Sequence, residues 1–307
     1  MKKCVWVLVF VLFFVVATFA TDLKIGVDLP FTGDGKVDAE DAWDAFQLAN
    51  ELMPSIGSYK LVLIKGDDNT DAKLTQKVTR NLIDEGSVVL IGYPWSSLAI
   101  AGGAIAEKAK IPLVSTWSTN PLTTQGKKYV SRVCFIDPFQ GKVAANFAVK
   151  DLKVKNAVLI VDRSEAYCTG LATYFKKAFV KLRGRILTSL YFKRGDSGTL
   201  LKNLAQKALT LNPDMIFIPS YPREMGTLIK NLRNSGYRGV LMAGDTGGTR
   251  DVLEYAGDSV NGFYFTDHFN AKAAKTKAAN FFITKFKEKY GRVASAGSAL
   301  GLSLIHI

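Results

Sequence analysis

Cysteine and histidine are scarce in this sequence. Its 307 residues include three cysteines and two histidines. Cys4 lies in an apolar N-terminal segment, which leaves Cys134 and Cys168 in the rest of the chain. Because cysteine and histidine are the usual ligands of zinc and related metals, we expect no transition-metal site. The spacing of Cys134 and Cys168 does not show whether they lie close together, so one disulfide and two buried thiols both remain open.

The motifs that commonly carry catalysis or bind a cofactor are also missing. There is no GxGxxG after the first strand, no GxxxxGK[ST] and no GxSxG. The segment 195–198, GDSG, is similar to the nucleophile segment of chymotrypsin-like proteases, but these require a preceding histidine and His268 follows it. The segment 67–71, DDNTD, lacks the glycine and the terminal glutamate of a calcium loop. We therefore expect a protein without catalytic activity, cofactor or bound metal ion.

Long apolar runs are absent beyond the N-terminus. There, Lys2 and Lys3 precede the apolar run Val5–Ala17, and the small residue Ala20 follows it. This order is typical of a secretory signal peptide, which assigns residues 1–20 to the signal and predicts a periplasmic or extracellular protein. The run is long for the core of a signal peptide and short for a membrane span, so an uncleaved tether is the alternative.

Acidic residues become sparse in the second half of the chain. Residues 21–120 contain 9 Lys and Arg against 14 Asp and Glu, whereas residues 121–307 contain 29 against 13. A nucleic-acid surface would combine such charge with exposed aromatic residues or a recognition motif, and neither is found, so we expect no nucleic-acid partner. The basic charge is interpreted as a solvated face, with attraction to anionic lipid or an acidic partner as the alternative.

Short apolar runs alternate with helical patterns along the chain, beginning with a strand. The runs are, in order, KIGVDLP, YKLVLIKGD, VVLIG and IPLVST, and then NAVLIVD, RILTSLYFK, MIFIPSY and GVLMAGD. Alternation of this kind predicts a parallel sheet with helices on both faces. Because the series occurs twice, the predicted fold class is α/β, with two doubly wound parallel-sheet lobes.

Two crossings between the lobes are predicted, one near residues 131–140 and one after Gly248. Lobe 1 would then contain residues 21–138 and 249–300, including the strand in NGFYFTDHF and a helix at 274–289. Lobe 2 would contain residues 139–248. Two lobes also agree with the length of the exported part, which exceeds what one compact core usually supports.

The C-terminus has an unusual composition. The stretch GSAL at 297–300 reads as the start of a helix, but the chain stops at LSLIHI without a capping residue. These last six residues resemble the translated end of an adapter used in sequencing libraries. Residues 301–307 are therefore predicted to be a non-native tail, and the fold is predicted to be C-terminally truncated.

Polar residues follow several of the predicted strands. In open parallel sheets, ligands bind beyond the carboxyl ends of the strands, where helix N-termini present unpaired N–H groups. Ser96 or Ser97 would occupy the N-cap of a helix, either as an ordinary cap or as part of a carboxylate site. The hydroxyl-rich segment 115–119 either caps the next helix or binds a ligand. Asp245, a lone acid in the basic lobe, would form an Asx turn or pair with a ligand ammonium.

Several segments in this order resemble a known family, the periplasmic substrate-binding proteins of ABC transporters for branched-chain amino acids (the Leu/Ile/Val-binding family). The segments are LPFTG (29–33), STNPLT (118–123), FIDPFQG (135–141), YPREMGTLIKNLRNSG (221–236) and LMAGD (241–245). The resemblance covers most of residues 24–300 and implies the type I periplasmic-binding fold, with two lobes joined by a hinge.

The resemblance also implies a function. Proteins of this family capture an amino acid by hinge closure and deliver it to a membrane permease. For this chain the implied partners are a branched-chain amino acid or related small amide and the permease of an ABC importer. The alternative is a sensory ectodomain, tethered by an uncleaved N-terminal segment, that reports its ligand to a membrane partner.

Site residues in lobe 1 are carried over from the resemblance position by position. The side chains of Ser96 and Thr119, with backbone groups at Trp117 and Ser118, are implied to hold the carboxylate and the amino group of the ligand. Trp117 stands where leucine-type binders tend to have a small residue, and Trp95 lies nearby. This difference implies a narrowed pocket or one that favours aromatic stacking.

Site residues in lobe 2 are carried over in the same way. Tyr167 and Tyr221 are implied to line the pocket, and Asp245 is implied to pair with the ligand ammonium. Asp245 is one methylene shorter than the glutamate common in aliphatic binders, which shifts the ammonium or admits a water. The resemblance therefore supports an amino acid or a similar small amide more firmly than leucine itself.

Overall fold

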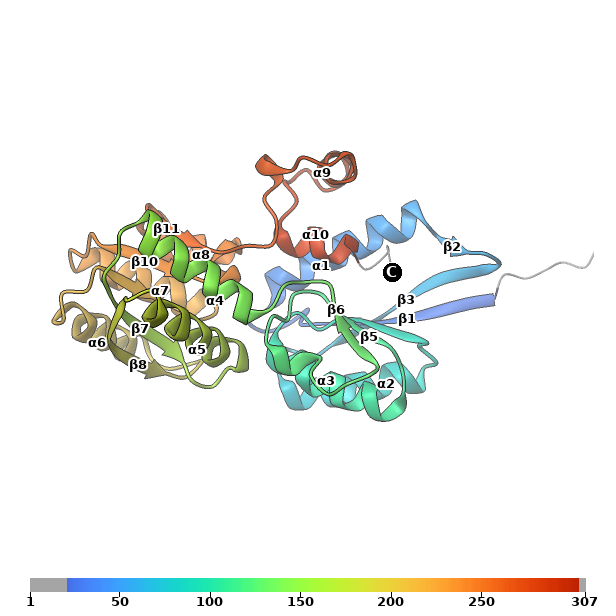
Figure 1. Cartoon of the computed structure of the whole chain (residues 1–307). Coiled ribbons are helices and arrows are strands. Elements are labelled where there is room, and N and C mark those ends of the chain that lie inside the picture. The colour runs from blue at the N-terminus through green and yellow to red at the C-terminus, as the bar shows by residue number, and fades with distance from the viewer. Residues whose placement is uncertain (1–20, 304–307) are drawn as a thin grey trace, which may run out of the picture.

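The computed structural model describes residues 21–303 (Figure 1). The signal peptide predicted at 1–20 and residues 304–307 of the predicted tail lie outside this range. Within it, no helix combines the length and the hydropathy needed to cross a membrane. Cys134 and Cys168 are both free thiols. Of the two possibilities left open by the sequence, a disulfide and two thiols, the structure has the thiols.

The first sheet has six strands in the order β2-β3-β1-β4-β5-β6, parallel except for the β2–β3 pair. Its strands are β1 (Thr21–Leu29), β2 (Ser55–Ile56), β3 (Tyr59–Asp67), β4 (Val89–Gly92), β5 (Leu113–Ser115) and β6 (Val130–Arg132). Helix α1 (Lys36–Leu52) covers one face, and α2 (Ala72–Asp84) with α3 (Ser96–Ala109) covers the other. Val27 and Leu29 of β1 point to the α1 face because side chains two residues apart share a face of a strand.

The second sheet has five strands in the order β11-β10-β9-β7-β8, all parallel. They are β7 (Asn156–Asp162), β8 (Arg185–Phe192), β9 (Met215–Phe217), β10 (Val240–Ala243) and β11 (Phe263–Phe265). Helices α4 (Asp137–Asn146) and α5 (Ala166–Lys181) cover one face, and α6 (Gly198–Leu209), α7 (Pro222–Asn234) and α8 (Asp251–Ala256) cover the other. The predicted α/β class with two parallel-sheet lobes is therefore confirmed.

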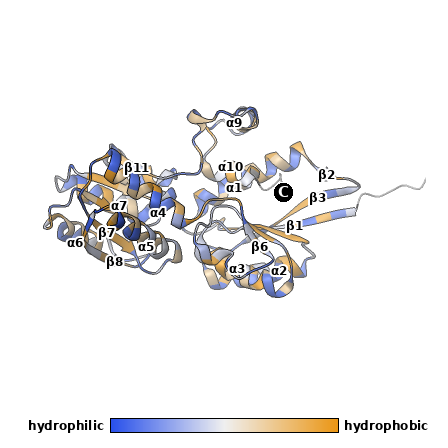
Figure 2. Ribbon diagram, in the orientation of Figure 1, coloured by the Kyte–Doolittle hydropathy of each residue, from blue (hydrophilic) through white to orange (hydrophobic). Residues whose placement is uncertain are grey.

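Helices of both lobes are amphipathic. In Figure 2, orange and blue stretches alternate along helices such as α2 and α3, because apolar residues recur every three or four positions. In α2, for example, Leu82 is buried in the core that faces the sheet, whereas Asn81 and Asp84 are exposed. This periodicity holds each helix against its sheet and brings the helix N-termini to the carboxyl ends of the strands.

The second predicted crossing, after Gly248, is wrong. Strand β11 pairs with β10 in parallel, and α8 packs against α7, so residues 249–265 continue the second lobe. The physical reason is that β10, α8 and β11 form one more strand–helix–strand unit, which returns to the same sheet. The chain reaches lobe 1 only afterwards, through α9 (Lys277–Tyr290) and α10 (Ala296–Ser303), and α10 packs along α1 (Figure 1).

Gly92 ends β4 just before the loop that leads to α3. Its φ is +109°, and a Cβ atom there would lie 2.3 Å from the backbone oxygen of Asp28. We expect Gly92→Ala to lower the free energy of unfolding by about 2 kcal/mol, because it adds both backbone strain and a contact with an immovable carbonyl. Urea denaturation measures the loss. Gly198→Ala, at a position with no atom within 4 Å of the added Cβ, is the control, and an equal loss there would contradict the explanation.

Candidate functional site

The predicted site residues gather where the two lobes meet. Ser96, Thr119, Tyr167, Tyr221 and Asp245 are all buried, with exposed fractions of 7% or less. Two of the contacts that join them lie within a lobe, and one, between Asn120 and Ala166, crosses from lobe 1 to lobe 2. The amide of Asn120, next to Thr119, donates to Ser96 Oγ (3.3 Å), and the Asn120 side chain donates to the carbonyl of Ala166, next to Tyr167 (2.7 Å). The two tyrosine rings lie 5.7 Å apart.

On the lobe 1 side, α3 begins at Ser96 and its N-cap is Trp95, so neither Ser96 nor Ser97 is the capping residue that the sequence predicted. The reason is that Trp95 has the extended backbone of an N-cap (φ −85°, ψ 146°), which places the serines inside the first turn. Ser97 is only partly buried. The Thr119 hydroxyl is buried and has no hydrogen bond of regular geometry with any described residue.

On the lobe 2 side, Tyr221 is the N-cap of α7 and Tyr167 lies in the first turn of α5. Asp245 follows β10. Its carboxylate accepts a hydrogen bond from Gln140 Nε2 (2.7 Å), and its other oxygen lies 3.2 Å from His268 Nε2. These partners come from other segments, whereas an Asx turn would use the backbone two residues on. Within residues 21–303 the Asp245 side chain therefore does not form an Asx turn, and its pairing with a ligand ammonium stays a prediction.

Trp95 was placed near the pocket by the sequence, but its partner in the other lobe was not predicted. Its ring stacks on Tyr221 of the other lobe, with centroids 3.4 Å apart and planes 12° apart, and its Nε1 donates to Asp38 Oδ2 (3.1 Å). Arg194 of lobe 2 lies 5.4 Å from the ring centroid. Trp95 thus belongs to the apolar core of lobe 2 although its backbone lies in lobe 1.

Three arginines of lobe 2 also contact lobe 1. Arg194 donates to the carbonyl of Thr70 (3.1 Å), a guanidinium nitrogen of Arg223 lies 3.5 Å from Asp34, and Arg250 donates to Asp41 (3.0 Å). With the Trp95 stack, these contacts describe a closed arrangement of the lobes. No local sequence pattern could predict these contacts, because each joins residues more than a hundred positions apart in the chain.

Asp137 is a second residue to which the sequence assigned no role. It begins α4, is fully buried, and neither of its carboxylate oxygens has a hydrogen-bond partner of regular geometry within residues 21–303. Burial raises its pKa to about 8, helped by the negative charge of Asp245 and opposed by the Thr119 hydroxyl and Arg132. The segment FIDPFQG contained this residue, but nothing local distinguishes it from a helix-start acid.

Other acids at the same junction are perturbed in the same direction. Burial raises the pKa of Asp38 to about 8, with Asp251 as the largest neighbouring charge, and burial raises the pKa of Asp267 to about 7. A carboxyl group titrates this high when its charged form lacks solvent and a cation. The junction between the lobes is therefore an environment that favours a positively charged group.

These shifts predict how stability depends on pH. Asp137 has an ordinary pKa of 3.8 and a folded-state pKa of about 8, so between these values the folded protein keeps a proton that the unfolded chain releases. Folding stability should therefore fall as pH rises from about 4 to 8. We expect Asp137→Asn to exceed the parent protein in stability by about 2 kcal/mol at pH 8 and to match it near pH 4, measured by urea denaturation. Asp22→Asn, at an exposed position, should leave the pH profile unchanged; a parent-like slope in Asp137→Asn would contradict the assignment.

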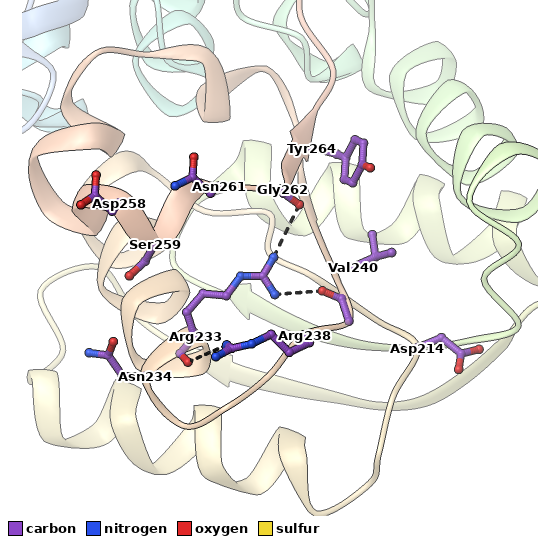
Figure 3. A pocket seen from close by; sticks show the side chains of 11 residues that line it. Asp214, Arg233, Asn234, Arg238, Val240, Asp258, Ser259, Asn261, Gly262 and Tyr264 are labelled. Carbon is purple, nitrogen blue, oxygen red and sulfur yellow. Dashed lines mark hydrogen bonds between the residues drawn. The ribbon is translucent and has the colours of Figure 1, made fainter.

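Lobe 2 also has a cavity of about 710 Å³ at the end of its sheet that lies away from lobe 1 (Figure 3). Arg233 crosses it, but its guanidinium already donates to the carbonyls of Tyr237 and Gly239, both at 3.0 Å, and to Gly262 at 3.5 Å. These bonds tie the end of α7 to the loops before β10 and β11. The cavity is thus built from structural contacts, at the amino ends of the strands, away from Asp245.

The geometry can be compared with that of known proteins. A leucine binding protein from Thermotoga maritima superposes with a TM-score of 0.88 and 36% identity, covering 92% of this chain and 80% of that chain. A branched-chain amino acid transporter substrate binding protein from Streptococcus pneumoniae, in complex with isoleucine, superposes with a TM-score of 0.87 and 25% identity, covering 93% and 82%.

Sequence comparison also finds amino acid-binding proteins among the relatives of this chain. The Leu/Ile/Val-binding protein homolog 3 of Brucella melitensis is 27% identical over 273 residues, which cover 87% of this chain and 73% of that protein. The chain spans 64–73% of the length of the first three curated relatives that it matches, all of which are named as binding proteins. The sequence profile described as periplasmic binding protein matches residues 22–307. This chain therefore belongs to the periplasmic binding protein family, with the type I fold of its branched-chain amino acid-binding relatives.

Proposed function

We propose that this protein is the extracytoplasmic substrate-binding component of an ABC importer, which captures an amino acid between its lobes and passes it to a membrane permease. The observation that carries the proposal is the meeting of Ser96 and Thr119 of lobe 1 with Tyr167, Tyr221 and Asp245 of lobe 2 at one buried junction. Hydroxyls and a helix N-terminus stand on one side, and a carboxylate stands on the other. Export through residues 1–20 belongs to the same proposal.

Lobe 1 supplies the carboxylate subsite in this mechanism. The first turn of α3 presents free backbone N–H groups and the positive end of the helix dipole, and Ser96 and Thr119 add hydroxyl donors. Donors and dipole act on the same group, so a carboxylate gains several hydrogen bonds at once. The Thr119 hydroxyl supports this role, because it is buried beside the Asp137 carboxyl and has no hydrogen bond of regular geometry within residues 21–303.

Lobe 2 supplies the ammonium subsite. Asp245 holds its carboxylate in place through Gln140 and His268, and Tyr167 and Tyr221 form the adjacent apolar wall. Asp137, with two unpartnered oxygens, adds a second acceptor for ligand N–H groups. A zwitterion would therefore span the gap with its carboxylate toward lobe 1 and its ammonium toward Asp245 and Asp137.

Closure of the lobes supplies the switch. A ligand shifts a conformational equilibrium only through contacts that differ between the two states. The Trp95–Tyr221 stack and the contacts of Arg194 and Arg250 with lobe 1 can exist only when the lobes are together. Bound ligand would add to these contacts, so that the closed form is populated and recognised by the permease.

Isothermal titration calorimetry against the proteinogenic amino acids tests the proposal. The protein is first unfolded in urea and refolded, so that no ligand carried from the cell remains bound. We expect one amino acid or a small group of them to bind at a single site with a Kd in the range of about 1 μM or tighter. If none binds, the proposed function fails. The tethered sensory alternative would use the same pocket and differs only in residues 1–20.

A further inference from the structure

A small cavity lies between the lobes beside Asp245. Its volume is about 30 Å³, and it is lined by four carboxylates with two ring-bearing residues, Trp117 and His268. The carboxylates are those of Asp38, Asp41, Asp245 and Asp267. A water molecule needs about 10–15 Å³ of such volume. The cavity therefore has room for a group of the size of an ammonium ion, and its walls are acidic.

The charges of the cavity walls are only partly balanced. Asp41 is paired with Arg250 and Arg292, at 3.0 and 2.9 Å. In the described part of the chain, Asp38, Asp245 and Asp267 have no lysine or arginine within ion-pair distance, and His268 is the sole basic residue facing Asp245. Buried carboxylates without a cation are costly, so these groups hold a proton when the cavity is empty and become charged when a cation enters it.

Unpartnered acceptors point to the same conclusion. Asp38 is 7% exposed and lines the cavity; Oδ2 accepts from Trp95, while Oδ1 accepts no hydrogen bond from residues 21–303. Outside the cavity lining, the side-chain carbonyl oxygen of Gln140 and both carboxylate oxygens of Asp137 are buried and have no hydrogen bond of regular geometry. All these free atoms are acceptors or carboxylates, and an ammonium or guanidinium group supplies the missing donors.

The cavity is not explained by a metal ion. Among the described residues, no group of three or more histidine, cysteine or acidic side chains is arranged to hold one. The aromatic ring of Trp117 in the lining is also a poor neighbour for a hard metal cation, which prefers a shell of oxygen atoms. It is a good neighbour for an organic cation, which gains cation–π attraction as well as hydrogen bonds.

We propose that the ligand carries a second positive charge and that this group binds in the cavity lined by Asp38, Asp267 and Trp117. The substrate class is then a basic amino acid. The inference rests on the proposed function, in which the α-ammonium occupies Asp245 and neutralises one carboxylate. Asp38 and Asp267 remain without a cation in that arrangement, and a side-chain ammonium or guanidinium provides it.

Lysine and norleucine separate this inference from the proposed function, because they have the same carbon chain and differ in the terminal ammonium. Calorimetry on the refolded full chain, with ornithine and arginine as further basic ligands, should give a basic amino acid that binds at least about 30-fold more tightly than norleucine. If norleucine or leucine binds as tightly as every basic ligand, the inference is overturned while the proposed function stands. If no amino acid binds, both fail.

Asp38→Asn tests the residue itself. The amide oxygen can still accept the Trp95 hydrogen bond, but the charge is removed. We expect the ratio of basic-ligand to norleucine affinity to fall at least about tenfold. Glu40→Gln, an exposed acid on the same helix, is the control and should keep the ratio. Equal losses for both ligands in Asp38→Asn would indicate a purely structural role and overturn the assignment; Asp267→Asn repeats the test should Asp38→Asn fail to fold.

Discussion

Replacing Asp245 by asparagine is expected to weaken amino acid binding at least about 30-fold while the protein stays folded. The side chain is buried, and it is fixed by Gln140 at 2.7 Å and by His268 at 3.2 Å. Asparagine keeps the shape but removes the charge, and it presents an N–H₂ group where the ligand presents an ammonium. Loss of one partner of a buried, hydrogen-bonded charge pair costs about 2–5 kcal/mol, which corresponds to roughly 30-fold to several thousand-fold in affinity.

Calorimetry measures the affinity of Asp245→Asn, and urea denaturation checks that the variant is folded. The matched control is Asp258→Asn, which removes an acid of lobe 2 at the opposite end of the strands. That control should bind like the parent protein. An affinity within threefold of the parent in Asp245→Asn would remove Asp245 from the ammonium subsite and leave Asp137 as the remaining candidate.

The two-lobe architecture could be predicted because the strand–helix alternation is a local, repeated signal. The assignment of individual strands to a sheet is less local. The composition of the short strand FYF at 263–265 suits either sheet, and only its pairing with β10 shows that it belongs to lobe 2. The predicted crossing after Gly248 was therefore wrong, although the presence of the strand was predicted.

The residues of the candidate site also fall into those that the sequence could predict and those that it could not. Ser96, Thr119 and Asp245 follow strands, and the carboxyl ends of parallel strands are where ligands bind. The resemblance to the family then singled them out among the polar residues at strand ends. The role of Asp137 and the partner of Trp95 were not predicted, because the residues that they meet lie far away in the sequence. Trp95 meets Tyr221 of the other lobe, and Asp137 lies near Asp245, 108 positions later. No local pattern records that a carboxylate will be buried without a partner.

The acidic residues at the lobe junction show that the net charge of the chain does not describe the charge of its binding site. The chain as a whole carries +13, yet the walls of the interlobe cavity contain four carboxyl groups. The two facts are compatible because the basic residues are mostly on exposed surfaces, where water screens them, whereas the acids act at short range in a buried space. Ligand charge is therefore selected by a handful of buried groups rather than by the overall field.

Trp95→Ala is expected to have the largest effect on closure of the lobes. The indole is 2% exposed, stacks on Tyr221 and contributes to the core of the opposite lobe. Truncation of a buried tryptophan costs about 3–5 kcal/mol. Much of that loss falls on the closed state alone, because the Tyr221 contact is absent when the lobes separate. We expect ligand affinity to fall by about two to three orders of magnitude.

Small-angle X-ray scattering of ligand-free and ligand-saturated protein separates loss of closure from loss of folding. Trp95→Ala should have a larger radius of gyration than the parent protein, and Trp95→Phe, which keeps an aromatic face for Tyr221, should lie between them. Trp43→Ala is the control, since Trp43 packs against Phe31 within lobe 1. It should lower the free energy of unfolding with less than a tenfold change in affinity. Parent-like scattering and affinity in Trp95→Ala would mean that the stack merely fills space, and that closure is governed by the arginine contacts and the ligand itself.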